Sequence, residues 1–255
     1  MLTANSCASA LIWGCVLLGV GIFTLQNDIK EIAYQDSLCI CRTYFNYASP
    51  ALFHHSKLLQ AIYGYATVVY PHRLFWQSAK CQLSAICLIW IYCWIYPLGF
   101  MFSSEMHYIY NVDNQICQLR LRLSFPRIYA VCCVYIIPMS IIMLIYFKLI
   151  RYVHGMSNHT TPANTLLRAK RQLKMVQRIV KIITILLILG FPYVLFLLIS
   201  FFTTPPKYHF RIAYIFIDIS MVCVIVVSFQ FTDPLKASIM KRIQRSPSTT
   251  VPAIT

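Results

Sequence analysis

The sequence predicts an all-α membrane protein whose chain crosses the bilayer six times. Six long apolar runs are spread over the 255 residues, and about 20 residues of helix are enough to cross the hydrocarbon core. Hydrophobic residues make up 59% of the chain and charged residues only 11%, too few to cover a soluble domain of this length. The basic residues concentrate in alternate connecting segments, as in multi-pass proteins. Together these observations favour a membrane bundle over a soluble core.

The six runs, taken in order, predict six membrane helices. The apolar runs at residues 1–26, 81–104, 128–147 and 182–206 contain no charged residue, and those at 43–72 and 212–232 contain one each, Lys57 and Asp218. The fifth helix is expected to continue below the membrane, because residues 168–181 are basic and contain neither Gly nor Pro. The predicted helices span residues 2–25, 39–70, 81–103, 127–152, 168–203 and 211–237.

The chain changes character after Pro234. Leu235, Ile239 and Ile243 recur every fourth residue while the basic residues point elsewhere, which predicts a short cytoplasmic amphipathic helix on the inner leaflet. Residues 246–255 are polar and are expected to be disordered. We therefore expect a single transmembrane helical-bundle domain over residues 1–245, followed by a disordered cytoplasmic tail.

The charges of the connecting segments predict the orientation. Segments 71–80 and 148–181 contain basic residues and no acidic one, and four basic residues against Asp233 follow residue 232. The positive-inside rule places these segments in the cytoplasm, and the acidic segment 26–38 outside. This topology also explains the net charge of +15, so the expected partner is the lipid bilayer and no nucleic acid. The plasma membrane is the expected location.

Motifs for catalysis or metal binding are missing from the sequence. It has no HExxH motif, no paired carboxylates and no Ser-His-Asp grouping, so we expect neither enzyme activity nor a cofactor. His54 and His55 are adjacent in a helix and face different directions, which disfavours a shared metal ion. Polar residues inside a membrane are costly and point to function. One alternative is therefore a transporter or channel in which Lys57, His54 and His55 line a polar path, although no internal repeat supports it.

Residues 63–71 read Tyr-Gly-Tyr-Ala-Thr-Val-Val-Tyr-Pro. This stretch resembles the end of the third helix in rhodopsin-like (class A) G-protein-coupled receptors, where an acid-Arg-Tyr triplet precedes apolar residues and a Pro. Tyr65 and Pro71 match that pattern, whereas Tyr63 stands in the place of the acid and Gly64 in the place of the Arg. Further landmarks fall in the family's order and spacing, namely Trp90, Pro138, Tyr146, Pro192, Tyr193, Asp233 and Pro234.

The resemblance implies that the six predicted helices are the second to the seventh of a seven-helix receptor bundle. The chain then begins inside a membrane helix, either because the gene product is incomplete or because a six-helix variant exists. The resemblance also implies a disulfide between Cys39, at the outer start of the second predicted helix, and Cys117 in an external loop. Both cysteines lie on the oxidising face, where a disulfide persists. Cys41 is a competing partner, two residues further on.

The resemblance further implies a pocket for an extracellular ligand. In the family, the wall that Asn46 and Tyr47 occupy contacts the ligand, and Tyr193 and Phe196 would lie opposite. Amine receptors of the family carry an Asp where this chain has Asn46, so a peptide or another ligand is favoured over a cationic amine. Hydrogen bonding between helices is the alternative role for these polar residues.

Signalling through a heterotrimeric G protein follows from the same resemblance. An external ligand would shift the family's fifth and sixth helices on the inner side. Several residues of this step are altered, since Gly64 cannot make the contacts of the family's Arg, and Leu11, Gly190 and Ala237 replace an Asp, a Trp and a Tyr. Impaired signalling, or a receptor-like protein that does not signal, therefore stays open. The residues assigned to activation and coupling are Tyr63, Gly64, Tyr65, Tyr146, Pro192, Asp233 and Pro234, with Lys170, Arg171 and Lys174 facing the cytoplasmic partner.

Overall fold

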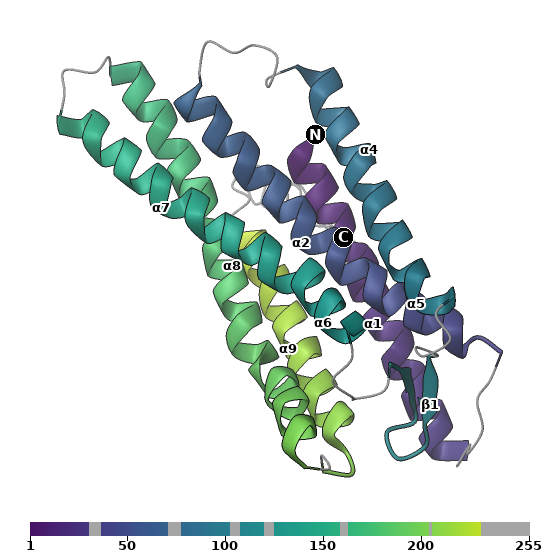
Figure 1. Cartoon of the computed structure of the whole chain (residues 1–255). Coiled ribbons are helices and arrows are strands. Elements are labelled where there is room, and N and C mark those ends of the chain that lie inside the picture. The colour runs from purple at the N-terminus through teal and green to yellow at the C-terminus, as the bar shows by residue number, and fades with distance from the viewer. Residues whose placement is uncertain are drawn as a thin grey trace, which may run out of the picture.

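The fold is a bundle of long helices with a small hairpin at one end (Figure 1). The computed structural model describes residues 1–30, 37–70, 78–102, 108–119, 125–158, 163–203 and 206–230. The long helices are α1 (Leu2–Lys30), α2 (Cys39–Val69), α4 (Ala79–Ile95), α7 (Ile137–Asn158), α8 (Ala163–Phe202) and α9 (His209–Gln230). Short elements extend two of them, namely η1 (Tyr96–Leu98) and α5 (Gly99–Phe102) after α4, and α6 (Phe125–Val131) with η2 (Cys132–Ile136) before α7.

Five of these helical stretches are long and apolar enough to cross a membrane: Leu2–Lys30, Ala79–Leu98, Ile128–Met156, Ala169–Ser200 and His209–Val227. The chain is thus a multi-pass integral membrane protein. The second predicted helix, α2, is too polar to join this set by composition, so its crossing stays a prediction. The last helix is described only as far as Gln230. The predicted amphipathic helix after Pro234 and the predicted disordered tail lie outside the described residues.

Helix α2 is central in the bundle and packs against α1, α4, α7 and α8. Its buried side chains extend from Cys39 to Val68, and they include polar ones such as His54, Ser56 and Gln60. A helix surrounded by protein can carry polar side chains that lipid would reject, because neighbouring helices offer partners. This position explains why the most buried helix is also more polar than its neighbours.

One buried amide joins three helices through the middle of the bundle. Asn5 of α1 donates from Nδ2 to the Ser56 hydroxyl of α2 at 3.0 Å. The indole Nε1 of Trp90 on α4 donates to Asn5 Oδ1 at 2.8 Å. The nitrogen and the oxygen of the Asn5 amide therefore both have hydrogen-bond partners, as a buried polar side chain requires.

The structure adds an element that the sequence pattern did not predict, an antiparallel hairpin of β1 (Ile109–Asn111) and β2 (Ile116–Gln118). Figure 1 shows it at the end of the bundle where α1 ends, which is the outer end in the predicted topology. Strands of three residues carry too short an alternation to be recognised from the sequence. We refer to residues 108–119, which contain both strands, as the hairpin.

Candidate functional site

A cavity lies between the helices near the hairpin. The space that the centre of a water molecule can reach there is about 70 Å³, several times the ~10–15 Å³ that one water needs. Its lining comes from α1, α2, α6, η2, α8 and α9, and none of the described lining residues is charged. They are Trp13, Leu17, Asn46, Tyr47, Pro50, Ala130, Val131, Val134, Tyr135, Tyr193, Tyr214 and Ile217.

The hydroxyl of Tyr214 connects three elements at the cavity. Asn46 of α2 donates to it from Nδ2 at 2.5 Å. Gln118, at the end of β2, also donates to this hydroxyl from Nε2. Because Tyr214 itself belongs to α9, one oxygen atom joins α2, α9 and the hairpin. Any ligand that competes for this oxygen would change contacts among all three.

Tyr47 is held in place by other aromatic side chains. Its backbone carbonyl accepts a hydrogen bond of 2.5 Å from the Tyr96 hydroxyl. Its ring stacks with that of Tyr108 at a centroid distance of 6.1 Å, and the ring of Phe100 meets it edge-on at the same distance. These contacts connect one wall of the cavity to Tyr108, the first residue of the hairpin.

The four residues predicted to line a ligand pocket do not all lie together. Asn46, Tyr47 and Tyr193 line the cavity. Phe196 is not among its lining residues, and its ring lies 6.2 Å from that of His209, where α8 and α9 meet. Sequence reasoning missed Tyr214 and Gln118, because no local motif marks them and their meeting depends on the position of the hairpin.

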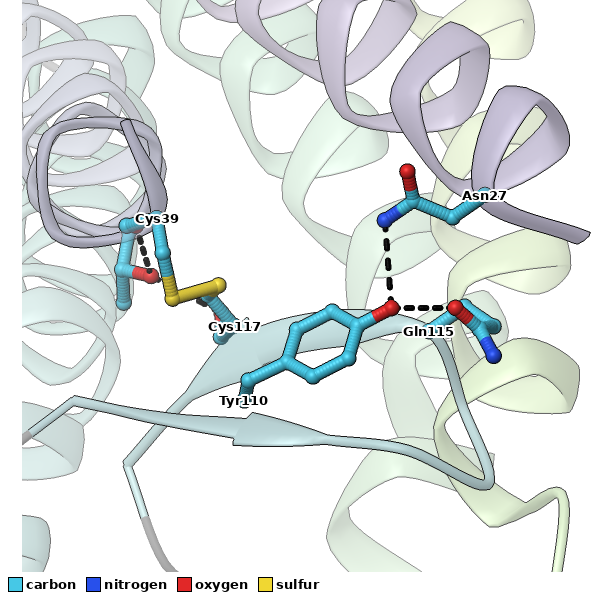
Figure 2. Close-up of a disulfide and its surroundings, with 6 residues drawn as sticks. Asn27, Cys39, Tyr110, Gln115 and Cys117 are labelled. Carbon is cyan, nitrogen blue, oxygen red and sulfur yellow. Dashed lines mark hydrogen bonds between the residues drawn. A yellow bond between two sulfur atoms is a disulfide. The ribbon is translucent and has the colours of Figure 1, made fainter. Parts of the chain in front are cut away.

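A disulfide between Cys39 and Cys117 attaches the hairpin to the first residue of α2 (Figure 2). It joins residues 78 positions apart, with a Cα–Cα distance of 5.5 Å. The Thr43 hydroxyl lies 2.9 Å from the carbonyl oxygens of both cysteines. The predicted pairing is thereby confirmed, and Cys41 carries a free thiol.

The hairpin is also hydrogen-bonded to α1. Asn27 donates from Nδ2 to the Tyr110 hydroxyl at 3.2 Å, and that hydroxyl donates to Gln115 (Figure 2). Asn27 is buried although it lies only three residues from the end of α1. The last turns of α1 therefore continue past the predicted boundary at residue 25 and support the hairpin.

A third attachment joins the turn of the hairpin to the start of α9. The side chain of Asn114 is fully buried. It accepts a hydrogen bond of 3.1 Å from the Phe210 backbone N–H and donates one of 3.2 Å to the Lys207 carbonyl. The exposed ion pair of Lys207 and Asp113, at 3.5 Å, adds little. The hairpin is thus connected to α1, α2 and α9, which all contribute lining residues to the cavity.

The other end of α2 packs closely against α8 at Gly64. A Cβ atom at Gly64 would lie 2.8 Å from Met175 Cε and 3.4 Å from Gln172 Oε1. Because Gly64 has no side chain, the end of the Met175 side chain fits into the space beside it. Tyr65 and Tyr146 pack beside it around the buried side chains of Val68, Leu149, Val153, Ala169 and Val176.

The remaining residues predicted for activation and coupling are scattered. Tyr63 is half-buried, and Lys170, Arg171 and Lys174 are exposed on α8. Pro192 lies inside α8. Asp233 and Pro234 lie outside the described residues.

The three residues of the transporter alternative have separate surroundings in α2. His54 is buried between the rings of Trp13 and Tyr135, at centroid distances of 5.8 and 4.9 Å. Lys57 is buried with Nζ 5.3 Å from the centroid of the Phe53 ring. His55 lies beside Tyr92, 5.3 Å between ring centroids. None of His54, His55 and Lys57 is among the described residues that line the cavity.

These features define a multi-pass helical bundle with a cavity next to a disulfide-anchored hairpin. Among solved structures, the crystal structure of squid rhodopsin is similar, with a TM-score of 0.75 over 96% of this chain and 75% of the rhodopsin chain. The sequences are 13% identical, so the likeness shows the fold, a bundle like those of G-protein-coupled receptors. No protein-family model and no curated protein matches the sequence.

Proposed function

We propose that this protein is a rhodopsin-like (class A) G-protein-coupled receptor of the plasma membrane that binds an extracellular ligand beneath the hairpin. The observation that carries the proposal is the cavity between α1, α2, α6, α8 and α9, with the hairpin connected to three of these helices. A concave site with few, well-placed polar groups is typical of ligand binding. The likeness to squid rhodopsin supports the proposal at the level of the fold. The landmark residues support the assignment of these helices as the second to the seventh.

The ligand is uncharged, or presents an uncharged part to the cavity. The described lining offers tyrosine hydroxyls, the Asn46 amide and apolar side chains, but no carboxylate to pair with a cationic amine. Burying an unpaired charge in such a site would cost several kcal/mol. A peptide that inserts an apolar or aromatic side chain, or a neutral lipid-like molecule, fits this lining.

The long helix α8 provides the route from the cavity to the inner side. Tyr193 lines the cavity, and Met175 lies against Gly64 some 18 residues earlier in the same helix, about 27 Å away along the axis. A ligand that shifts α8 at Tyr193 would move Met175 relative to α2. Tyr63, Tyr65 and Tyr146 lie at this inner end, next to the proposed G-protein surface with Lys170, Arg171 and Lys174.

A receptor-like protein that does not activate a G protein is the second candidate. It is favoured by Gly64, because this glycine stands where the family pattern has an arginine and Met175 fills the space beside it. Ligand binding would then be retained without nucleotide exchange.

The test uses the full chain purified in nanodiscs and a panel of neutral lipids and short peptides. Compounds that bind in the cavity should raise the melting temperature of the native chain and of Phe196→Leu, which lies outside the cavity lining. They should have less effect on Asn46→Leu. Compounds that stabilise all three proteins equally would contradict the proposed site.

Purified heterotrimeric G proteins, added to the same nanodiscs, separate the two candidates. Compound-dependent nucleotide exchange supports the signalling receptor, and binding without exchange supports the second candidate. Flux of a panel compound into proteoliposomes without a G protein would contradict both candidates and favour a transporter.

A further inference from the structure

The cytoplasmic parts of α7 and α8 carry a concentration of basic side chains. Lys148 and Arg151 on α7 are exposed, and so are Lys170, Lys174 and Lys181 on α8. Residues 148–181 contain eight Lys and Arg and no Asp or Glu. The positive-inside rule accounts for the number of these residues. It does not determine which side of each helix they occupy.

On α8 the exposed lysines lie on the face that is directed away from the bundle. Lys170, Lys174, Lys181, Ile188 and Leu195 are separated by 4, 7, 7 and 7 residues and are all exposed. Seven residues are close to two turns of helix, so the five side chains form one stripe. Ile188 and Leu195, in the apolar part of α8, are exposed, as expected of a surface in contact with lipid. The lysines continue that surface toward the cytoplasm.

The opposite side of α8 faces protein. Ala169, Val176, Ile179 and Ile183 are buried, and the side chains nearest to Gly64 of α2 are Gln172, Met175 and Val176. A cytosolic protein entering between α2 and α8 would therefore meet this second side. The stripe of lysines is directed away from this entry, so Lys170 and Lys174 would meet such a protein only at its edge.

Helix α7 repeats the arrangement. Leu144, Lys148 and Arg151 are spaced by four and three residues and are all exposed, so they share one face. The exposed apolar Phe147 lies beside them. Helices α7 and α8 pack against each other through shared buried clusters. Two neighbouring helices thus present basic residues below lipid-facing apolar ones.

We propose that these outward faces of α7 and α8 bind the headgroups of anionic phospholipids in the inner leaflet, with the multiply phosphorylated inositol lipids bound best. A phosphorylated headgroup offers several charges to lysine ammonium groups that lie within one Debye length, about 8 Å at physiological salt. The lysine stems lie along the apolar helix surface while their charged ends reach the headgroups. This binding does not depend on the proposed receptor activity.

The lysines of α8 are expected to contribute unequally. Lys181 directly precedes the apolar run that starts at residue 182, so it lies at the hydrocarbon boundary. Lys174 and Lys170 lie about 10 and 16 Å further out, at 1.5 Å per residue. Each basic residue near an anionic surface is worth about a fivefold change in affinity. Lys181 and Lys174 should therefore carry most of the binding, and Lys170 little.

The experiment measures transfer of a fluorescent phosphatidylinositol bisphosphate to the full chain in phosphatidylcholine nanodiscs. The variant Lys174→Gln/Lys181→Gln should bind about 25-fold more weakly, from fivefold per residue. Lys174→Arg/Lys181→Arg should bind within about threefold of the native chain, because it keeps the charge. Adding Lys170→Gln should change the affinity less than twofold. All these side chains are exposed, so equal melting temperatures would show that every variant is folded.

Two controls test the alternatives. Lys80→Gln, also exposed and cytoplasmic in the predicted topology, should bind the lipid like the native chain. Equal lipid binding by the native chain and Lys174→Gln/Lys181→Gln would overturn the proposal and leave these lysines as topology signals only. If that variant lost binding of a G protein but kept the lipid, the faces would instead be a protein interface, which also overturns it.

Discussion

At the scale of single residues, Tyr214 is the most consequential side chain that sequence reasoning did not identify. Its hydroxyl accepts hydrogen bonds from Asn46 and Gln118, which come from positions 168 and 96 residues away. No local pattern predicts such a meeting, because it depends on the packing of α2 and α9 and on the hairpin. Asn46 could be predicted as a pocket residue only because it occupies a ligand-contacting position in the family pattern.

Replacing Tyr214 by Phe tests this junction. The change leaves the amide nitrogens of Asn46 and Gln118 without the oxygen they share, and an unsatisfied buried donor costs about 1–3 kcal/mol. We expect a lower melting temperature for Tyr214→Phe in nanodiscs. Tyr208→Phe, at a side chain that is 48% exposed, should melt like the native chain.

A double variant makes the test specific. Because Asn46→Leu removes one of the two donors, Tyr214→Phe should cost less in that background than in the native chain. Strict additivity would show that the two side chains do not interact in the folded protein.

At the scale of elements, the apolar runs predicted the helices well and their ends less well. The helix predicted at 39–70 is α2, Cys39–Val69. Helix α1 instead ends at Lys30 rather than near residue 25, because Asn27 finds a buried partner in the hairpin that hydropathy cannot reveal. The hairpin itself was not predicted. Its position is determined by a disulfide and by side-chain hydrogen bonds to distant helices, not by the composition of its short strands.

The hairpin should loosen locally when Asn114 is replaced by Ala. The change removes the acceptor of the Phe210 N–H and the donor to the Lys207 carbonyl. The disulfide and Asn27 still hold the other side of the hairpin. We expect amide hydrogen exchange to accelerate in residues 108–119 and at the start of α9, with little change elsewhere.

Val112→Ala serves as the matched control for Asn114→Ala. Val112 lies in the same turn, and its side chain is 50% exposed. If its exchange rates rose as much as those of Asn114→Ala, the turn would be sensitive to any substitution and the attachment to α9 would not be the cause.

At the scale of the whole molecule, α8 connects the two ends of the bundle, since Tyr193 lines the cavity and Met175 fills the space at Gly64. The family resemblance directed attention to Gly64 and to three residues that line the cavity, Asn46, Tyr47 and Tyr193. It could not predict Met175, because the family pattern has a large side chain at the position of Gly64. The gap and the side chain that fills it are seen only in the packed bundle.

The contact at Gly64 predicts a graded effect of substitution. An alanine Cβ would displace only the flexible end of Met175, and the cost is offset by about 1 kcal/mol gained from better helix propensity. Gly64→Ala should therefore leave the melting temperature nearly unchanged. Gly64→Leu must also displace Val176 and should destabilise the protein by about 1–3 kcal/mol.

A second substitution tests the cause of the Gly64→Leu effect. Met175→Ala opens space next to Gly64, so it should recover part of the loss in the Gly64→Leu background while destabilising the native chain. If Met175→Ala made the Leu variant still less stable, Met175 would not be the side chain that restricts this position.

The polarity of α2 has a consequence for how the protein enters the membrane during synthesis. Lys57 lies near the middle of α2, and a charged residue at the centre of a lone inserted helix costs about 2.5–3.5 kcal/mol. Helix α1 is strongly apolar and can enter lipid by itself. Helix α2 reaches its place at low cost only when α1, α4 or α7 is present to shield its polar side. We therefore expect α2 to leave the translocation machinery late, together with a neighbouring helix.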